Sequence, residues 1–401
     1  MTLSRRVSAL ILTLLALALV GAGCGGNDDE GGGALKSGET FTVGYGNNLT
    51  GFLAVHDKLI SNGAQVAVDE INNAGGIDGK VKIDLQLADT KSDPAASVTA
   101  ANDLIAKNVD AIVLPCNTDF QIAMATVTDR KDVLTISPCN ADPTASNKFD
   151  TYWPVGMAGN AQGAQLANYV KDQGYKNAYV LDSNFLYINL MSKYFKRAAG
   201  FRDINISGTD NIPFGATGFP TDFSPQVTKI KNASPKPDVI MTALFTPFVN
   251  TLVKQLRAQG IDTPVVGTDG MDTGLHLKAG GKSAEGTVFT TFGFPVPGSA
   301  TDKFYDQYAA KYGSRPDGSY TALGYEVFKV LEAAIEKADS TDPADIRKTL
   351  SDGLEVDGAL GKITYRGGGS HNPQTEVALV KVENGKFALV KKGVPEDVPE
   401  P

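Results

Sequence analysis

The sequence predicts an α/β protein with two doubly wound parallel-sheet lobes. Short apolar strands alternate with amphipathic helices along nearly the whole chain, a pattern typical of parallel sheets that are covered by helices on both faces. About ten strand–helix units are present, too many for one small sheet, so two lobes are the natural division. The chain has 401 residues, of which 42% are hydrophobic, enough for a large core.

The first helix is predicted over residues 57–74. Ile60, Ala64, Ala67 and Ile71 recur there at spacings of four, three and four, so they line one face of a helix. The flanking strands are expected at 41–46 and 81–88.

The second helix is predicted to begin at Asp93 and Pro94. Aspartate is a favoured N-cap, and proline fits the first helical position. The apolar runs 111–115 and 133–137 are expected to be buried parallel strands on either side of a helix at 118–130.

After Trp153 the same alternation resumes. Helices are expected at 159–172, 188–199, 223–233, 247–259, 300–312, 319–338 and 343–351, and strands at 177–182, 203–208, 238–244, 265–268, 286–291 and 363–365. The chain ends in two strands, 377–382 and 387–392, joined by a hairpin that contains the favoured turn pair Asn384-Gly385.

Parallel α/β sheets bind ligands in the loops beyond the carboxyl ends of their strands. The candidate site therefore lies in six loops: 46–56, 115–119, 137–143, 183–188, 245–248 and 268–272.

Composition and motifs exclude several function classes. The net charge of −8 argues against a nucleic-acid partner. The segment 279–283 looks like part of a phosphate-binding loop, but His276 stands where the first glycine is required. The three histidines (56, 276 and 371) have no metal-site spacing, and no protease or hydrolase motif occurs. We therefore expect neither an enzyme nor a bound metal or cofactor.

The N-terminus predicts export. Two arginines precede the apolar run 7–20, which suits a signal peptide and is short for a membrane span. Cys24 follows small residues in an arrangement that resembles a bacterial lipobox, although Gly21 stands where leucine is usual. We expect a signal peptide at 1–23, lipid on Cys24 and a flexible Gly-rich tether at 24–39. An ordinary signal peptide or twin-arginine export remains the alternative.

Five stretches coincide with one known family. Residues 47–79, 87–105, 136–143, 263–272 and 325–338 resemble the leucine/isoleucine/valine-binding family of type 1 periplasmic binding proteins, in the right order. The most specific block is 47–79, with its D-E-I-N-x-x-G-G-I-x-G run. The resemblance covers the chain from about residue 40 onward.

The resemblance implies two lobes that are joined by a three-segment hinge and close over a small polar solute. The expected division is 40–155 plus 292–342 for lobe 1, and 156–291 plus 343–401 for lobe 2. The implied protein is a monomer, held by its lipid at the outer face of the cytoplasmic membrane. It binds an amino acid or a similar compound for an ABC permease. A sensory receptor of the same fold, or a binder of amides, urea or aromatic acids, remains the alternative.

The resemblance also implies ligand contacts from two loops of the first lobe. They are Cys116, Asn117 and Thr118 in one loop, and Cys139, Asn140 and Ala141 in the other. The first loop leads into a helix, whose N-terminus attracts anions such as a carboxylate. Asn117 and Ala141 replace the usual serine and threonine, which leaves recognition of an α-carboxylate open.

The second lobe is implied to contribute Asp269, which would receive the ligand's α-amino group. Phe185 and Tyr187 fall where an aromatic ring covers the ligand, and Phe245 flanks the next loop. His56 falls where the ligand's side chain is contacted. The alternatives are a turn-forming aspartate, ordinary core packing of Phe245 and the nearby Phe248, and a solvent-facing histidine.

A disulfide is predicted between Cys116 and Cys139, which end two successive apolar strands. If these strands are neighbours in the sheet, the two Cα atoms come within disulfide range. The alternative is two small buried thiols. The pairing departs from the family, in which the partner lies near position 92, here Ser92.

Overall fold

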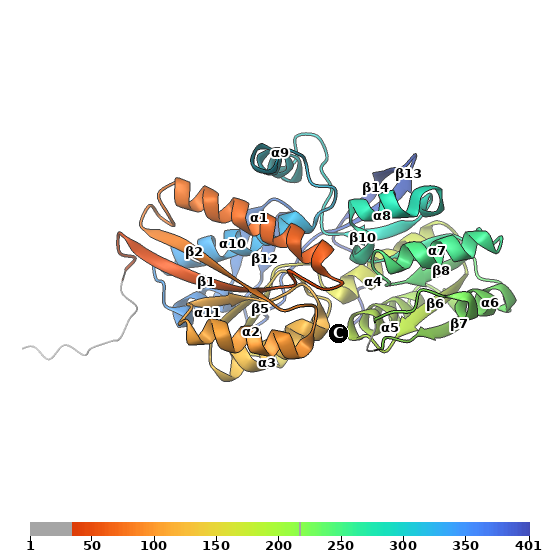
Figure 1. Cartoon of the computed structure of the whole chain (residues 1–401), viewed down its shortest axis with the longest axis horizontal. Coiled ribbons are helices and arrows are strands. Elements are labelled where there is room, and N and C mark those ends of the chain that lie inside the picture. Colours follow the sequence, from red (N-terminus) through yellow and green to blue (C-terminus); the bar gives the residue numbers. More distant parts are fainter. Residues whose placement is uncertain (1–33, 216–217) are drawn as a thin grey trace, which may run out of the picture. The chain divides into compact units, whose positions relative to one another are not determined.

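Two sheets carry the fold of this computed structural model (Figure 1). The structure describes residues 34–215 and 218–401. The predicted signal peptide, the lipid site Cys24 and most of the predicted tether lie outside the described residues. Within the described ranges, no helix has the length and apolar character needed to cross a membrane.

The first sheet is wholly parallel and has the order β2-β1-β3-β4-β5. Figure 1 shows α1 and α10 on one side of this sheet and α2 and α3 on the other. The elements are β1 (Glu39–Asn47), α1 (Ala54–Asn73), β2 (Val81–Asp89), α2 (Pro94–Ala106), β3 (Ala111–Val113), α3 (Thr118–Arg130), β4 (Leu134–Ser137), β5 (Tyr152–Pro154), α9 (Ala300–Tyr312) and α10 (Tyr320–Ala338).

Both faces of the first sheet are apolar, as expected for a covered parallel sheet. Along β3, Ala111 and Val113 belong to the core that includes α1 and α10. Ile112 and Leu114 belong to the core on the opposite face, beneath α2 and α3. Successive side chains of a strand point to opposite faces, which explains why β3 is continuously apolar.

The second sheet repeats the winding of the first. Its order is β14-β13-β10-β9-β8-β6-β7, parallel from β10 to β7, with an antiparallel hairpin added at one edge. The elements are α4 (Gly159–Asp172), β6 (Asn177–Ser183), α5 (Leu186–Gly200), β7 (Asn205–Ile212), α6 (Ser224–Asn232), β8 (Val239–Thr242), α7 (Phe248–Ala258), β9 (Val265–Gly267), α8 (Gly274–Gly280), β10 (Val288–Thr291), β13 (Val377–Glu383) and β14 (Lys386–Gly393).

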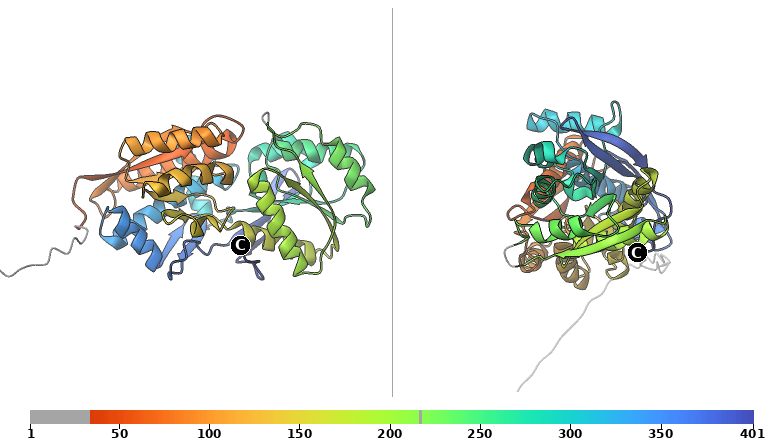
Figure 2. Two further views of the ribbon diagram at one scale, coloured as in Figure 1. Left: turned by 90° about the horizontal axis from the view of Figure 1, so that it is seen from below. Right: turned by 90° about the vertical axis from the view of Figure 1, so that its right-hand side faces the viewer.

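The terminal hairpin confirms the predicted turn. Asn384 and Gly385 have φ values of 52° and 69°, as a type I′ turn requires, and they connect the paired residues Glu383 and Lys386. The hairpin, dark blue in Figure 2, lies at the edge of the second sheet beside β10.

One segment lies in a different place from the predicted division. Residues 343–365 were expected in the second lobe, but α11 (Pro343–Asp352), β11 (Leu354–Gly358) and β12 (Gly361–Tyr365) contribute to the core of the first. Ile346 and Leu350 are fully buried there, so this helix shields the first sheet's core from water. The third crossing between the sheets therefore comes after residue 365 and not at 342.

The contact between α1 and α10 depends on two glycines. A Cβ atom on Gly63 would overlap the backbone of Thr321, and one on Gly324 would overlap the backbone of Ile60. The two helices therefore pack backbone to backbone. This close packing fixes the relative position of His56 and Tyr320, the residues that α1 and α10 contribute to the site described next.

Candidate functional site

A cavity lies at the carboxyl ends of strands from both sheets. This is the place where doubly wound sheets bind ligands. Ten of the eleven ligand-binding candidates from the sequence line it: His56, Cys116, Asn117, Thr118, Cys139, Asn140, Ala141, Tyr187, Phe245 and Asp269. Five further residues complete the lining: Leu53, Gln162, Gly270, Phe292 and Tyr320.

Asp269 is the charged group of this cavity. It begins a short 3-10 turn (Asp269–Met271) directly after β9 and is 5% exposed. Its two carboxylate oxygens accept hydrogen bonds from the hydroxyls of Tyr187 and Tyr320 over 2.9 and 2.8 Å. Burial raises the pKa of Asp269, and hydrogen bonds from Tyr320, Gln162 and Tyr187 oppose that rise.

Every donor to Asp269 is neutral. Burial raises the pKa of both tyrosines well above the ordinary value, so they are protonated donors. The cavity lining, as far as the structure describes it, includes no lysine or arginine. A buried carboxylate without a cation is costly, so a cationic group of a ligand would complete this end of the cavity.

The start of α3, unlike Asp269, offers hydrogen-bond donors. Thr118 is its first residue, so the backbone N–H of Thr118 has no acceptor within the helix. The Thr118 hydroxyl is buried and has no partner among the described residues. A helix N-terminus with a free N–H and a free hydroxyl is suited to an anion.

The two asparagines of the lining have different roles. Asn117 is the N-cap of α3, because its side-chain oxygen accepts from the N–H of Asp119 over 3.0 Å. Asn140 donates its amide to Asn372 Oδ1 over 3.0 Å, and its own Oδ1 is buried without a partner among the described residues. Asn117 therefore caps α3, whereas the side-chain oxygen of Asn140 is an unused hydrogen-bond acceptor.

His56 lies in the first turn of α1 and is 3% exposed, so the solvent-facing alternative is wrong. Burial lowers the pKa of His56 to about 4, which leaves the ring neutral at pH 7. Nε2 faces the carbonyl oxygen of Gly270 at 3.4 Å, which requires the proton to be on Nε2. The ring packs edge-on to Tyr320, with centroids 5.0 Å apart.

Cys116 and Cys139 form a disulfide, with their Cα atoms 5.2 Å apart. They follow β3 and β4, which are parallel neighbours as the prediction required. The backbone N–H of Cys116 also bonds the buried carboxyl of Asp57, whose pKa is raised to about 7 by burial. Both loops that carry the first lobe's lining residues are therefore tied together and to α1.

Phe185 is the one candidate that does not line the cavity. It is buried directly before α5, in contact with other phenylalanines that lie behind the wall. Its ring centroid lies 4.6 Å from that of Phe214 and 5.9 Å from that of Phe245. Phe185 therefore belongs to the core behind the wall, and its prediction as a ligand contact is wrong, whereas Phe245 both packs in this cluster and lines the cavity.

Gln162, Phe292 and Tyr320 line the cavity but lie outside the six loops predicted for the site. Gln162 lies in α4, and its Oε1 accepts from the Thr290 hydroxyl over 2.6 Å. Phe292 directly follows β10, so the rule about strand ends could have found it. Tyr320 begins a helix that no strand directly precedes, and nothing in its local sequence indicates a site.

Comparison with known proteins identifies the family. A model of the family described as periplasmic binding protein matches residues 40–386. The chain is 31% identical over 354 residues to the Leu/Ile/Val-binding protein BraC3 of Rhizobium johnstonii, covering 87% of this chain and 94% of that protein.

Solved structures agree. The branched-chain amino acid transporter substrate-binding protein LivJ of Streptococcus pneumoniae, in complex with isoleucine, has a TM-score of 0.78 at 26% identity, covering 88% of this chain and 100% of that one. A solute-binding protein of an ABC transporter from R. palustris, in complex with benzoate, has a TM-score of 0.78 at 17% identity, covering 90% and 98%. The chain therefore belongs to the Leu/Ile/Val-binding family of type 1 periplasmic binding proteins.

Proposed function

We propose that this protein binds an α-amino acid in the cavity and delivers it to an ABC permease. The observation that carries the proposal is Asp269, a buried carboxylate held by two neutral hydroxyls at 2.9 and 2.8 Å with no cation in the lining. An α-ammonium group would supply the missing positive charge and its hydrogen bonds. Charge-assisted bonds of this kind contribute about 1.5–3 kcal/mol each.

The α-carboxylate would lie at the start of α3. There it would accept hydrogen bonds from the N–H of Thr118, which has no acceptor within α3, and from the Thr118 hydroxyl, which has no partner among the described residues. The missing threonine at position 141 is no obstacle, because the helix N-terminus supplies the donors that an anion needs.

An apolar part of the remaining wall would contact the ligand's side chain. Leu53, Phe245 and Phe292 are buried residues of this wall. The isoleucine bound by LivJ, at 26% identity, supports this ligand class. The benzoate-binding relative, at 17% identity, supports only the fold, and benzoate has no cation for Asp269.

Binding would proceed by hinge closure. A solute that contacts both lobes stabilises only the closed arrangement, so it shifts the equilibrium by its differential affinity. A shift from mostly open to mostly closed needs roughly 5 kcal/mol. The ligand's ammonium group would bind Asp269 of the second lobe, and its carboxylate would bind Thr118 of the first. Together these bonds would provide a contribution of that order.

The protein would act outside the cytoplasm as a lipoprotein anchored through Cys24. The family is extracytoplasmic, and a charged start with an apolar run before Cys24 supports export and lipidation. Mass spectrometry of the membrane-extracted protein would test the anchor. A diacylglyceryl-modified Cys24 at the mature N-terminus is expected, and an unmodified mature chain in the soluble fraction would contradict it.

A thermal-shift screen of residues 34–401 tests the ligand class. It should compare each amino acid with two matched analogues, for example L-leucine with 4-methylpentanoate, which lacks the amine, and with leucinamide, which lacks the carboxylate. A native-state ligand at 100 times its Kd adds about 2.7 kcal/mol, a rise of a few degrees in Tm. Shifts with intact amino acids alone are expected. Shifts with the amine-free acids alone would contradict the role of Asp269.

A further inference from the structure

Helix α5 (Leu186–Gly200) begins without a cap of its own. Its N-cap residue is Phe185, whose side chain makes no capping hydrogen bond. The first backbone N–H groups of any helix lack acceptors within the helix, so an acceptor must come from elsewhere.

That acceptor is Asp119, which belongs to the other sheet's α3. Asp119 Oδ1 accepts from the N–H of Leu186 over 3.2 Å, and Oδ2 accepts from the N–H of Tyr187 over 3.4 Å. Asp119 is itself oriented, because its own N–H donates to Asn117 Oδ1 over 3.0 Å. A carboxylate from the first lobe thus caps a helix of the second lobe and interacts favourably with its dipole.

Aromatic contacts surround this cap. The rings of Phe120 and Phe185, the next residue on α3 and the residue before α5, pack edge-on with centroids 6.5 Å apart. Phe52, from the loop before α1, packs against both rings, at 6.2 and 6.3 Å. The cap is therefore half-buried, in an environment where a hydrogen bond to a charged group is stronger than in water.

The cap connects to the ligand cavity through one residue. Tyr187 is held at its backbone N–H by Asp119, and its hydroxyl donates to Asp269. Asp119 itself does not line the cavity. We propose that Asp119 is a positioning residue: it latches the closed lobes by capping α5 across the cleft, and it holds Tyr187 where it orients Asp269.

The latch exists only when the lobes are closed. In an open arrangement, water solvates both the carboxylate and the start of α5, so the cap contributes only to the closed state. Loss of the cap should therefore raise the rate of opening and of ligand release while leaving each lobe folded. This inference rests on the proposed function, because it takes the cavity as the place where the solute is held.

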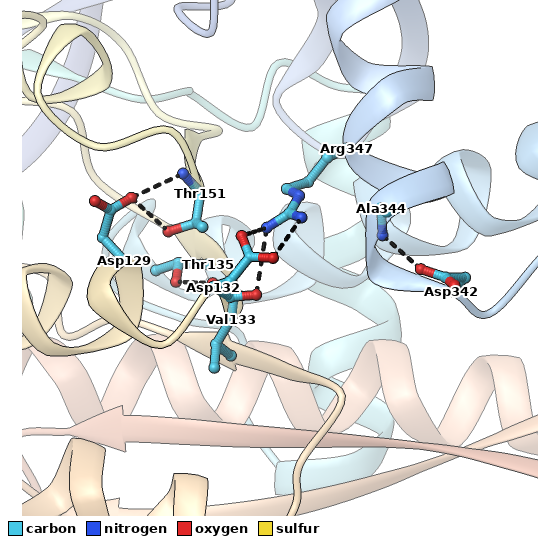
Figure 3. A network of polar contacts seen from close by, with 8 residues as sticks. All are labelled: Asp129, Asp132, Val133, Thr135, Thr151, Asp342, Ala344 and Arg347. Atoms are coloured by element: carbon cyan, nitrogen blue, oxygen red, sulfur yellow. Dashed lines mark hydrogen bonds and ion pairs between the residues drawn. The ribbon is translucent and has the colours of Figure 1, made fainter.

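The test compares Asp119→Asn with Asp129→Asn. Asp129 lies on the same helix, and its carboxylate accepts from the N–H and hydroxyl of Thr151 over 3.1 and 3.2 Å, wholly within the first lobe (Figure 3). Both changes replace one carboxylate by an amide of equal size. Asp119→Ala is a second variant, since alanine is the best helix former and leaves α3 intact. Circular dichroism checks that each variant is folded.

Stopped-flow dissociation of L-leucine, used as the probe, is the first measurement. Loss of a helix cap corresponds to roughly a three- to thirtyfold change in an equilibrium or rate constant. We therefore expect the dissociation rate to rise by that factor in both Asp119 variants and to stay unchanged in Asp129→Asn. Small-angle scattering is the second, with a larger radius of gyration expected for both Asp119 variants. Unchanged release and unchanged scattering would overturn the latch. If the parent binds neither L-leucine nor any other amino acid, the proposed function fails, and the same two measurements with the solute that does bind decide on the latch alone.

Discussion

The Tyr187 hydroxyl donates a hydrogen bond to Asp269 over 2.9 Å. Both residues belong to the second lobe, but the backbone N–H of Tyr187 is held by Asp119 of the first lobe. The Tyr320 hydroxyl completes the arrangement at the second carboxylate oxygen. The carboxylate is therefore held in one orientation when the lobes are closed, by donors that reach it from both sheets. An acceptor that is fixed in the closed form loses little further freedom when it pairs with the ligand, which favours affinity.

Asp269→Asn should remove most amino-acid binding. The amide keeps the size of the side chain but loses the charge that an ammonium group needs, and truncating one partner of a buried charge pair costs about 2–5 kcal/mol. We expect Kd to rise about a hundredfold or more in titration calorimetry with the best amino acid from the screen. Tyr320→Phe, which removes one of several donors, should cost about tenfold. Equal affinities of Asp269→Asn and the parent would show that the amine binds elsewhere.

Thr118→Val tests the carboxylate end of the cavity. Valine has the shape of threonine without its hydroxyl, so the variant removes one donor at the start of α3. A hydrogen bond to a charged group contributes about 1.5–3 kcal/mol, which predicts a tenfold or greater rise in Kd. Thr126→Val is the control on the same helix, because the Thr126 hydroxyl bonds the Ile122 carbonyl within α3 over 2.7 Å. Similar losses in both variants would indicate a general effect on the helix.

Much of the fold could be predicted because its signals are local. The alternation of apolar strands and helices depends on side chains a few positions apart, and so does the Asn384-Gly385 turn. The placement of residues 343–365 could not be predicted in this way. Nothing within a short helix and hairpin says which of two apolar cores they cover, and here the choice is made by contacts with α10.

The same distinction between local signals and long-range contacts explains which residues of the candidate site could be predicted. Loops after strands are visible in the sequence, and they supplied ten lining residues. Gln162 and Tyr320 lie near the starts of helices that reach the cavity only through the crossings between the sheets. Phe185 was misplaced for a related reason. Two aromatic residues, Phe185 and Tyr187, stand at the start of α5, and the helix turns only the second toward Asp269.

The Cys116–Cys139 disulfide should stabilise the fold and the site together. It closes a loop with a sequence separation of 23, for which loop entropy predicts about 3 kcal/mol. We expect urea unfolding of residues 34–401 to show a loss of that order when dithiothreitol is added. The variant with both cysteines changed to serine should be destabilised similarly and should no longer respond to dithiothreitol. A parent whose stability and ligand affinity are both insensitive to reduction would contradict a structural role.

His276 should make the protein less stable in mild acid. It is fully buried in α8, and burial lowers its pKa to about 4. The Thr287 hydroxyl donates to the Ala284 carbonyl over 2.7 Å, so His276 Nε2 must donate to that hydroxyl, at 2.9 Å. The neutral ring with its proton on Nε2 is therefore the native form, and a second proton has no acceptor.

The sign of the pH effect follows from how readily His276 binds a proton in the folded and in the unfolded state. The unfolded chain binds a proton at His276 near pH 6.5, whereas the folded protein resists protonation until about pH 4. The unfolded state binds more protons between these values, so the contribution of His276 is fully present above pH 6.5 and is lost as pH falls toward 4. The slope approaches about 1.4 kcal/mol per pH unit, for a total on the order of 3 kcal/mol. Urea unfolding between pH 7 and 4.5 should show a shallower loss in His276→Gln than in the parent, because glutamine can donate to Thr287 but does not titrate. His56 titrates in both proteins and cancels in the comparison, so equal slopes would mean that His276 is protonated as easily in the folded protein as in the unfolded chain.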